Sequence, residues 1–278
     1  MTVTVRPMRH ADLDAAAAAG AAGMGFAAPR GEPAWRRWRE RIAYPLETDP
    51  GGAFVAERDG QVIGVAEAVQ RSSLWVLSFL AVDPQAQGAG AGRALMRAAL
   101  GYGDPRRGLI VASDHAAALG LYERAGFVPR RALRARGRVD HGARRDGPCP
   151  VRPGTEADLE LAAAISVEQR GASHPLGFAL RRGGQLLVVP GRGFTVAQPG
   201  YGVWVLAARD EEAAAALLWR GLHVAGAAEQ YVRWITADNR WAVPVLKAAG
   251  LELTAYGAVC VRGDVGPLAP YLPSAPFA

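Results

Sequence analysis

The sequence predicts a mixed α/β protein built from two copies of one domain. Residues 5–13 (VRPMRHADL) recur as 151–159 (VRPGTEADL), and each copy reads as a short strand, a turn marked by proline and an alanine-rich helix. Later in each copy, 111–115 (VASDH) matches 235–239 (ITADN) in character. A chain that repeats its elements in the same order is a tandem duplication.

The elements of the first copy follow from apolar periodicity and from turn residues, with Asp59-Gly60 as a hairpin turn. The helices and strands alternate in a way typical of an α/β domain. The expected strands are 2–7, 53–58, 62–71, 74–82, 108–112 and a terminal set from Phe127 to about Val139; the expected helices are 10–22, 92–101 and 115–125, with a helix or loop from Glu32 to Tyr44.

The predicted domains are residues 1–145 and 146–278, joined by a connector rich in Pro, Gly and Arg around 142–150. With 278 residues, half of them hydrophobic, the chain is long enough for two domains with a sizeable core. The second domain ends in a proline-rich tail, residues 266–273.

Composition excludes several classes of protein. The net charge is +6, but Lys247 is the single lysine and the arginines are dispersed; we interpret the one dense run, 130–145, as a strand and connector rather than a nucleic-acid surface. Cys149 and Cys260 lie in different halves without metal-ligand spacing, which favours a reduced, cytoplasmic protein without a metal. The alanine run 15–28 is too short and too poor in large apolar residues to span a membrane, so no membrane partner is expected.

The stretch 74–101 carries the strongest functional pattern. An apolar strand, 74–82, is followed by the glycine-rich turn 87–92 and by a helix that begins near Arg93. Glycines without neighbouring bulk allow successive backbone N–H groups to surround one anion, and the positive end of the helix dipole adds to this. The arrangement predicts a diphosphate-binding turn.

Two other kinds of nucleotide-binding loop fit residues 87–92 less well. A Walker loop is excluded, because no Gly-Lys-Ser/Thr follows the glycines. A dinucleotide-binding loop is the less favoured alternative: Asp114 lies where that fold places its ribose-binding acid, but the glycines at 88, 90 and 92 have the wrong spacing.

Gln87-x-x-Gly90-x-Gly92 and the later Ala118-Leu119-Gly120-Leu121-Tyr122-Glu123-Arg124-Ala125-Gly126-Phe127 together resemble the GNAT superfamily of N-acetyltransferases. The resemblance implies two tandem acetyltransferase-like domains, each a twisted, mostly antiparallel sheet flanked by helices. It also implies that the sheet opens between the strands at 74–82 and 108–112, where the family places the pantetheine arm of its co-substrate, acetyl-CoA.

The resemblance implies a set of residues for acetyl-CoA. The turn would bind the diphosphate, and N–H groups from the preceding strand would polarise the thioester carbonyl. Where the family usually has an asparagine that reaches the pantetheine amides, this sequence has a histidine. The expected cofactor-binding residues are Leu80, Ala81, Val82, Gln87, Gly88, Ala89, Gly90, Ala91, Gly92, Arg93 and His115.

Three residues are candidates for catalysis. Tyr122 matches the family's tyrosine and is expected to protonate the departing thiolate, although a ring that only packs in its helix is the alternative. Glu67, inside an apolar strand, and Ser78, in the neighbouring strand, are candidates for accepting the amine proton. Either is equally explained as a solvent-facing or hydrogen-bonded strand residue.

Residues 32–49 follow the first helix, where such enzymes bind their acceptor. Trp35 and Trp38, with carboxylates such as Glu40 and Asp49, can hold a cationic amine. An amphipathic helix whose tryptophans pack on the sheet is the equal alternative.

The second copy lacks the glycine turn and reads Arg209-Asp210-Glu211-Glu212 instead. Asp210 is expected to cap the following helix, so that the chain's own carboxylates occupy the anion site. Leu246 stands where the first copy has Tyr122, although Asn239 keeps the family's asparagine. We interpret this copy as degenerate, with one CoA bound per chain, in the first half.

The predicted function is acetyl-CoA-dependent N-acetyl transfer to a primary amine of a small molecule or peptide, by direct attack in a ternary complex. The alternative is a non-catalytic acyl-CoA-binding or protein-interaction module. We expect a monomer with a pseudo-dimeric pair of domains, or a homodimer. The halves are expected to depend on each other, so that 1–145 alone is poorly soluble or inactive, and the tail at 266–273 is expected to lie across the first half.

Overall fold

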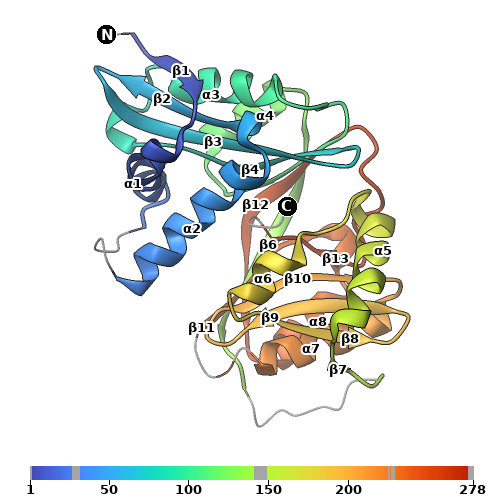
Figure 1. Ribbon diagram of the computed structural model, residues 1–278. Helices are drawn as coiled ribbons and strands as arrows, with labels where there is room; N and C mark the ends of the chain where they lie inside the picture. The colour runs from blue at the N-terminus through green and yellow to red at the C-terminus, as the bar shows by residue number, and fades with distance from the viewer. Residues whose placement is uncertain (1, 27–31, 141–148, 225, 227–228, 275–278) are drawn as a thin grey trace. The chain divides into compact units, whose positions relative to one another are not determined.

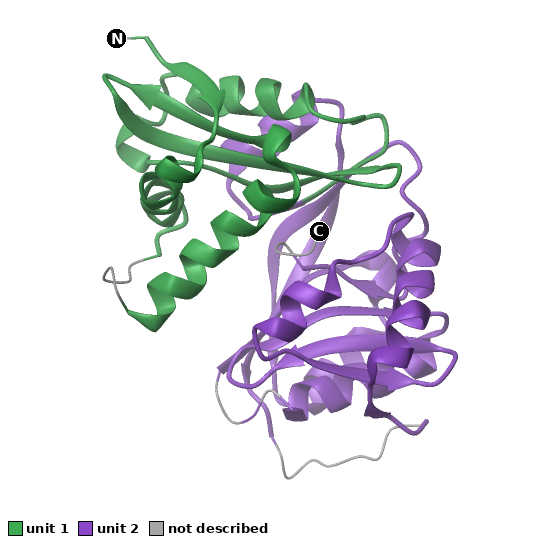
Figure 2. Ribbon diagram, viewed as in Figure 1, with its two compact units in different colours: residues 1–110 green, residues 111–278 purple. Residues whose placement is uncertain are grey.

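The computed structural model describes residues 2–26, 32–140, 149–224, 226 and 229–274 (Figure 1). The chain divides into two compact units, Met1–Ile110 and Val111–Ala278 (Figure 2). The fold is mixed α/β, as predicted. The predicted domain boundary between 145 and 146 lies outside the described residues and stays a prediction about the duplication.

The first unit contains a twisted sheet with the strand order β1-β2-β3-β4-β5. The first four strands pair antiparallel, and β4 pairs with β5 in parallel. Asp59 and Gly60 both have positive φ, which suits the two-residue hairpin between β2 and β3. The strands are β1 (Thr4–Pro7), β2 (Ala53–Arg58), β3 (Gln61–Arg71), β4 (Leu74–Val82) and β5 (Gly108–Ala112).

Helices cover both faces of this sheet (Figure 1). Helices α1 (Leu13–Gly23) and α2 (Pro33–Thr48) share an apolar cluster with Val65 of β3. Helix α3 (Ala91–Leu100) packs on the other face, where a Cβ on Gly64 would lie 3.1 Å from Leu95 Cδ1. Side chains of successive strand residues point to opposite faces, so Gly64 and Val65 face different helices.

The sheet of the first unit opens at the C-terminal end of β4. Pairing between β4 and β5 joins Trp75–Leu77 to Gly108–Ile110 and ends there. Among the described residues, 78–82 therefore have a strand neighbour on the β3 side only. The predicted opening between the strands at 74–82 and 108–112 is confirmed.

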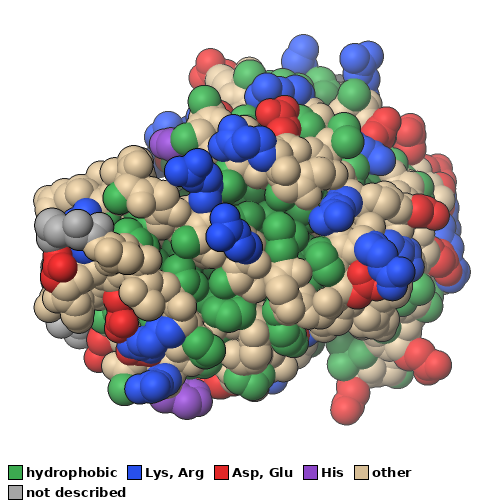
Figure 3. Space-filling view, turned by 90° about the horizontal axis from the view of Figure 1, so that it is seen from above, with side chains coloured by type: hydrophobic (Ala, Val, Ile, Leu, Met, Phe, Trp, Pro, Cys, Tyr) green, Lys and Arg blue, Asp and Glu red, His purple; other side chains and the backbone are tan. Residues whose placement is uncertain are grey.

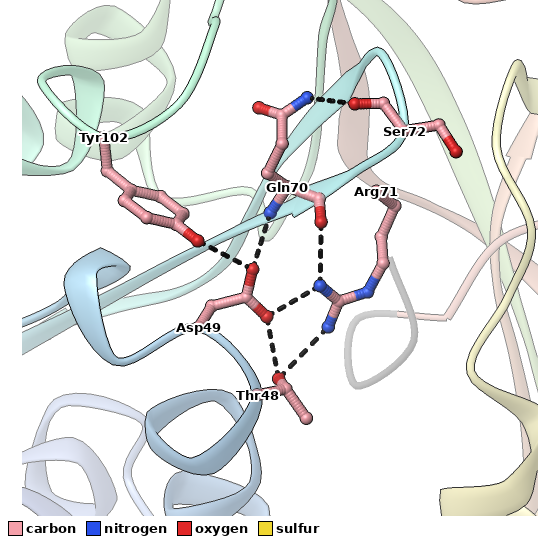
Figure 4. A network of polar contacts seen from close by, with 6 residues as sticks. All are labelled: Thr48, Asp49, Gln70, Arg71, Ser72 and Tyr102. Atoms are coloured by element: carbon pink, nitrogen blue, oxygen red, sulfur yellow. Dashed lines mark hydrogen bonds and ion pairs between the residues drawn. The ribbon is translucent and has the colours of Figure 1, made fainter.

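Asp49, at the end of α2, is buried in a network of polar contacts (Figure 4). Its Oδ1 accepts hydrogen bonds from the Gln70 backbone N–H (2.9 Å) and the Tyr102 hydroxyl (3.0 Å), and its Oδ2 accepts from Arg71 Nη1 (2.6 Å) and Thr48 Oγ1 (2.7 Å). The network fixes the C-terminal end of α2 against the end of β3. It also occupies both oxygens of Asp49.

The second unit carries a mostly antiparallel set of strands with the orders β12-β6-β11 and β13-β10-β9-β8-β7. Its strands are β6 (Val128–Arg138), β7 (Arg152–Pro153), β8 (Gln185–Val189), β9 (Gly193–Gln198), β10 (Gly202–Ala208), β11 (Glu229–Thr236), β12 (Glu252–Arg262) and β13 (Tyr271–Leu272). Its helices are α4 (Ala116–Arg124), α5 (Leu159–Arg170), α6 (Leu176–Arg181), α7 (Glu211–Val224) and α8 (Ala242–Ala248). Short 3-10 helices are η1 (His10–Asp12), η2 (Pro50–Gly52) and η3 (Pro84–Ala86) in the first unit, and η4 (Glu156–Asp158) and η5 (Ala237–Asn239) in the second.

The repeated segment forms the same local structure in both copies. Arg6 binds both carboxylate oxygens of Asp12 (2.7 and 2.8 Å), and Arg152 does the same with Asp158 (2.8 Å each). In each copy this aspartate also accepts a backbone N–H at the start of the 3-10 helix. The spacing of Arg and Asp in the repeat thus fixes a strand against a helix start.

Strand β6 differs from the expectation for the end of the first copy. Instead of a terminal set of strands there is one long strand, paired antiparallel with β11 on one edge and β12 on the other. Both partners come from the second copy, so a fragment that ended at 145 would leave both edges of β6 unpaired. The mutual dependence of the halves stays a prediction, and this pairing gives it a physical reason.

The tail does not behave as predicted. Its side chains Leu268, Tyr271 and Leu272 are buried, and β13 pairs with β10 inside the second unit. The expectation that the described part of the tail lies across the first half was wrong. The reason is that β10 offers an unpaired edge to the chain's own end.

Charge is dispersed on the face of the molecule that is seen from above in Figure 3. Figure 3 shows Lys and Arg side chains scattered among hydrophobic and acidic ones on the face it presents. Two arginines of β6 have partners within the second unit: Arg136 pairs with Glu229, and Arg134 lies over the ring of Tyr256. In the part of the chain that the structure describes, no helix has the length and apolar character needed to cross a membrane.

Candidate functional site

The glycine turn after β4 leads directly into helix α3. Gly88 and Gly90 have φ of 85° and 87°, and Gly90 is the N-cap of α3 without a side-chain cap. The first helical hydrogen bond runs from Ala94 N–H to Gly90 C=O (3.0 Å). The N–H groups of the first turn, Ala91 to Arg93, are therefore available to an anion.

Two side chains support this turn. Gln87 Nε2 donates to the Val82 carbonyl (3.2 Å), which ties the turn to the end of β4. Arg93 folds back so that its Nη2 lies 3.7 Å from the position of a Cβ on Gly90. A guanidinium thus lies beside the N–H groups, and both favour the same negative ligand.

The open edge of β4 adds a second set of donors. Asp83 N–H donates to the Ile63 carbonyl (2.9 Å), on the β3 side of the strand. Because N–H directions alternate along a strand, the N–H groups of Leu80 and Val82 point to the open side. Ala81 faces β3 by the same rule. Leu80 and Val82 are the members of this predicted group that can polarise a carbonyl.

A β-bulge in β4 lies just before this edge. Glu67 pairs with Phe79 and Ala68 pairs with Leu77, so Ser78 is the extra residue. The bulge turns the Ser78 carbonyl and hydroxyl toward α2, where Arg41 Nη2 donates to both (2.6 and 3.1 Å). Arg41 Nη1 donates to Glu67 Oε2 (3.0 Å), so one guanidinium holds both candidate bases.

Glu67 is completely buried, and its Oε1 has no hydrogen-bond partner among the described residues. Burial raises the pKa of Glu67 to about 7, although the nearby Arg41 acts in the opposite direction. A carboxyl with this pKa exchanges its proton near neutral pH, as a general base requires. Ser78 is also buried and bound to Arg41.

Arg41 was not among the residues predicted from the sequence. The signal was present, because Trp35, Trp38 and Arg41 follow at steps of three along α2 and so share its packed face. A guanidinium on that face must pair with a buried acceptor, and Glu67 was the carboxylate inside the neighbouring strand.

The proposed acceptor segment is largely packed. Trp35 is buried in the cluster with α1, and Trp38 donates from Nε1 to the Ala17 carbonyl (2.8 Å). Trp38 also contacts Phe79 edge-on, with ring centroids 5.5 Å apart. With Asp49 occupied as described above, the structure favours the packing alternative for Trp35 and Asp49. Phe79 follows the bulge residue Ser78 directly, and its contact with Trp38 places an aromatic pair beside the candidate bases. This pair is the part of the predicted acceptor segment that can still contact an acceptor.

Two candidates belong to α4 of the second unit. His115 is the exposed N-cap of this helix. Tyr122 lies in its last turn and is buried. Burial raises the pKa of the Tyr122 hydroxyl above its usual value, and the nearby Cys260 acts in the same direction. A tyrosine with a raised pKa stays protonated at neutral pH, as a proton donor must.

The start of α7 is the counterpart of the glycine turn in the second copy. Asp210 Oδ1 accepts the Ala213 N–H (2.9 Å), which confirms the predicted cap. Arg192 binds both oxygens of Asp210 (2.9 and 2.6 Å) and Glu212 (2.6 Å). The chain's own carboxylate occupies this helix start.

The first copy therefore combines an open strand edge with an uncapped helix N-terminus, an arrangement that suits a phosphorylated ligand. Residues 22–127 match the sequence profile of the Acetyltransferase (GNAT) family. This segment is a GNAT acetyltransferase domain.

Known proteins resemble the chain in sequence and in fold. The relatives in sequence match part of it. A mycothiol acetyltransferase of Streptomyces coelicolor is 41% identical over 86 residues, which cover 29% of this chain and 28% of that protein. The enzyme of the same name from Streptomyces avermitilis is 37% identical over 133 residues, 45% of this chain and 43% of the relative. The chain thus matches less than half the length of these relatives.

Solved structures share the fold over nearly the whole chain. A protein of Pyrococcus horikoshii superposes with a TM-score of 0.81 at 18% identity, covering 99% of this chain and 96% of its own. A tandem GNAT protein from the clavulanic acid biosynthesis pathway gives a TM-score of 0.59 at 13% identity, covering 96% and 99%. The predicted tandem fold is confirmed by these neighbours.

Proposed function

We propose that this chain is an acetyl-CoA-dependent N-acetyltransferase that transfers the acetyl group to a primary amine by direct attack. The observation that carries the proposal is the continuity of two donor sets in the first copy: the open-edge N–H groups of Leu80 and Val82, and the helix-start N–H groups of 91–93. A thioester joined to a diphosphate by a long arm matches this pair of sites.

The fit can be judged from the residues present. Gly88, Gly90 and Gly92 put no side chain in the way of a diphosphate, and Arg93 supplies a positive charge beside it. At the strand edge, N–H groups in fixed positions stabilise the oxyanion that forms when an amine attacks a thioester. Donors of this kind are worth about a hundredfold to a thousandfold in rate when one is lost.

We assign the base to Glu67 and the acid to Tyr122. Glu67 lies on the strand that pairs with the bulged strand and has a pKa suited to accept the amine proton. Arg41 donates both to Glu67 and to the Ser78 hydroxyl. Tyr122 donates to the leaving thiolate, and His115 takes the place of the family's asparagine toward the pantetheine amides.

The relatives named mycothiol acetyltransferases direct the choice of acceptor. An amine of the mycothiol type is the first candidate to test, with small amines and peptide N-termini beside it. The aromatic pair Trp38 and Phe79 suits an acceptor with an apolar or sugar-like face. Both cysteines are free thiols, which agrees with a cytoplasmic location.

Release of free thiol from acetyl-CoA in the presence of the amine panel tests the proposal. We expect amine-dependent thiol release and an acetylated product of the right mass. The alternative function, a non-catalytic acyl-CoA-binding module, predicts thermal stabilisation by CoA with no thiol release for any amine. No stabilisation and no thiol release would exclude both.

A further inference from the structure

The second copy contains the counterpart of the open strand edge. Strand β10 follows two antiparallel neighbours and leads into α7, as β4 leads into α3. Residues Leu206-Ala207-Ala208 stand at its C-terminal end, as Leu80-Ala81-Val82 do in β4. The edge of β4 is open, whereas the edge of β10 is occupied by the chain's own tail.

The tail makes backbone contacts along this edge. Ala208 N–H donates to the Pro270 carbonyl (3.1 Å), and β13 pairs Leu272 with Leu206 and Tyr271 with Ala207. The donor that the tail uses, the N–H of Ala208, corresponds to that of Val82. The tail therefore uses, at Ala208, the donor that the first copy leaves available at Val82.

Asn239 holds the same segment from the opposite side. Its Nδ2 donates to the Leu268 carbonyl (2.9 Å), and its Oδ1 accepts the Tyr271 N–H (2.8 Å). Within the repeat, Asn239 corresponds to His115. A carboxamide that pairs with both sides of an amide backbone recognises any extended chain of amides, and the pantetheine arm of CoA is such a chain.

The side chains of the tail are also bound within the second unit. Tyr271 is 1% exposed, and its hydroxyl lies 2.8 Å from His174 Nε2. Leu268 N–H donates to the Gln169 carbonyl (2.9 Å), and Gln169 Nε2 donates to the Ala208 carbonyl (2.8 Å). The tail is thus held at both its backbone and its side chains.

We propose that the second copy retains a groove for a pantetheine-like ligand and that residues 266–274 fill it as an internal ligand. The assignment of the ligand class depends on the proposed function, because it transfers the role of the β4 edge to β10. The groove lacks a diphosphate site, since Asp210 caps α7 and Glu212 lies beside it. Pantetheine, which carries no phosphate, is therefore the ligand that suits it better than CoA.

A cleavable tail tests this proposal in the full-length chain. Gly263 and Asp264 are exposed, so a site for a specific protease can be inserted between them, and the tail can be cut after folding. We expect the cut tail to remain bound and to exchange with a labelled synthetic peptide of residues 265–274. Pantetheine at millimolar concentration should accelerate its loss, and CoA should do so less. An exchange that pantetheine leaves unchanged would overturn the proposal and make β13 a structural strand only.

A variant of the uncut chain gives a second measurement if the insertion prevents folding. Asn239→Ala removes two hydrogen bonds to the tail and should speed amide hydrogen exchange at Ala208 and Tyr271 roughly ten- to hundredfold. Calorimetry should then find a second pantetheine site per chain but no second CoA site; Tyr201→Ala, at an exposed residue of the same unit, is the matched control. A loosened tail without a second pantetheine site would contradict the proposal. Loss of acetyl transfer leaves these readouts unchanged, so they are independent of a failure of the proposed activity.

Discussion

Arg41 and Glu67 form an ion pair of 3.0 Å in which the side chains are 8% and 0% exposed. Arg41 comes from α2 and Glu67 from β3, and the same guanidinium holds the Ser78 carbonyl in the bulge of β4. One arginine therefore links the helix that covers the sheet to both candidate bases. Its removal tests how the environment of Glu67 is set.

Arg41→Gln should shift the pH dependence of acetyl transfer. Loss of the positive charge leaves the effect of burial alone, so the pKa of Glu67 rises further and the acid limb of kcat/KM moves to higher pH. The fold should lose about 3–5 kcal/mol, since one partner of a buried pair is removed. Arg41→Lys should shift the limb less, because it keeps the charge. The control is Arg39→Gln on the same helix, because the Arg39–Asp14 pair is exposed. If the acid limb of kcat/KM stays at the same pH in Arg41→Gln, Glu67 does not titrate in the reaction.

Glu67→Gln should lower kcat about 10²- to 10⁴-fold and abolish that limb. A base acts in its ionised form, so wild-type activity should rise with pH through about 7. The contribution of Glu67 to folding stability depends on pH in the opposite direction to activity. It is fully present below the unfolded pKa near 4.5 and is lost as pH rises through about 7. Glu47→Gln, at an exposed position of α2, should change neither profile.

Gly90→Ala should weaken CoA binding by at least tenfold. The residue has φ of 87°, and an L side chain there costs about 1–2 kcal/mol. Its Cβ would lie 3.7 Å from Arg93 Nη2, the positive group beside the turn. Gly60→Ala has a similar strain at φ of 76° in the hairpin between β2 and β3, where a Cβ would meet no atom within 4 Å, and should reduce stability alone. Calorimetric CoA affinities equal in the two variants would remove the turn from the binding site.

Tyr122→Phe should reduce turnover and leave CoA affinity nearly unchanged. The ring still packs in its buried position, and only the proton donor is lost. The comparison is made with single-turnover kinetics, so that chemistry limits the rate, and Tyr201→Phe serves as the exposed control. Turnover at the wild-type rate would leave Tyr122 with a packing role.

His174 should make the second unit sensitive to acid. Burial lowers the pKa of His174 well below 6.5, with Arg170 acting in the same direction; Ser166 and Tyr271 are its other polar neighbours. Below pH 6.5 the unfolded chain takes up a proton that the folded chain excludes, so stability falls by up to about 1.4 kcal/mol per pH unit until the folded pKa is reached. Denaturant titrations between pH 7 and 5 measure the slope as a difference between the wild type and His174→Asn, because Glu67 contributes a slope of the opposite sign in this range. The difference should be absent between the wild type and His10→Asn, where the residue is exposed.

The local features of the first copy were predictable from the sequence. The apolar run before the glycines predicted β4, the glycines predicted a turn before α3, and the proline and alanines of the repeat predicted a strand, a turn and a helix. The Asp210 cap was predictable for the same reason. Each of these features joins residues within a few positions of one another, so the pattern itself contains the interacting partners.

The sequence by itself determined the tandem α/β fold, the donor turn and the identity of the candidate acid and bases. Only the tertiary structure decided that Arg41 pairs with Glu67, that β6 lies between β11 and β12, and that the tail fills the edge of β10. These contacts join residues far apart in the chain, and several segments satisfy the same demand for a buried partner or a free strand edge. Which segment takes each position depends on how the whole surface packs, and a local pattern does not contain that information.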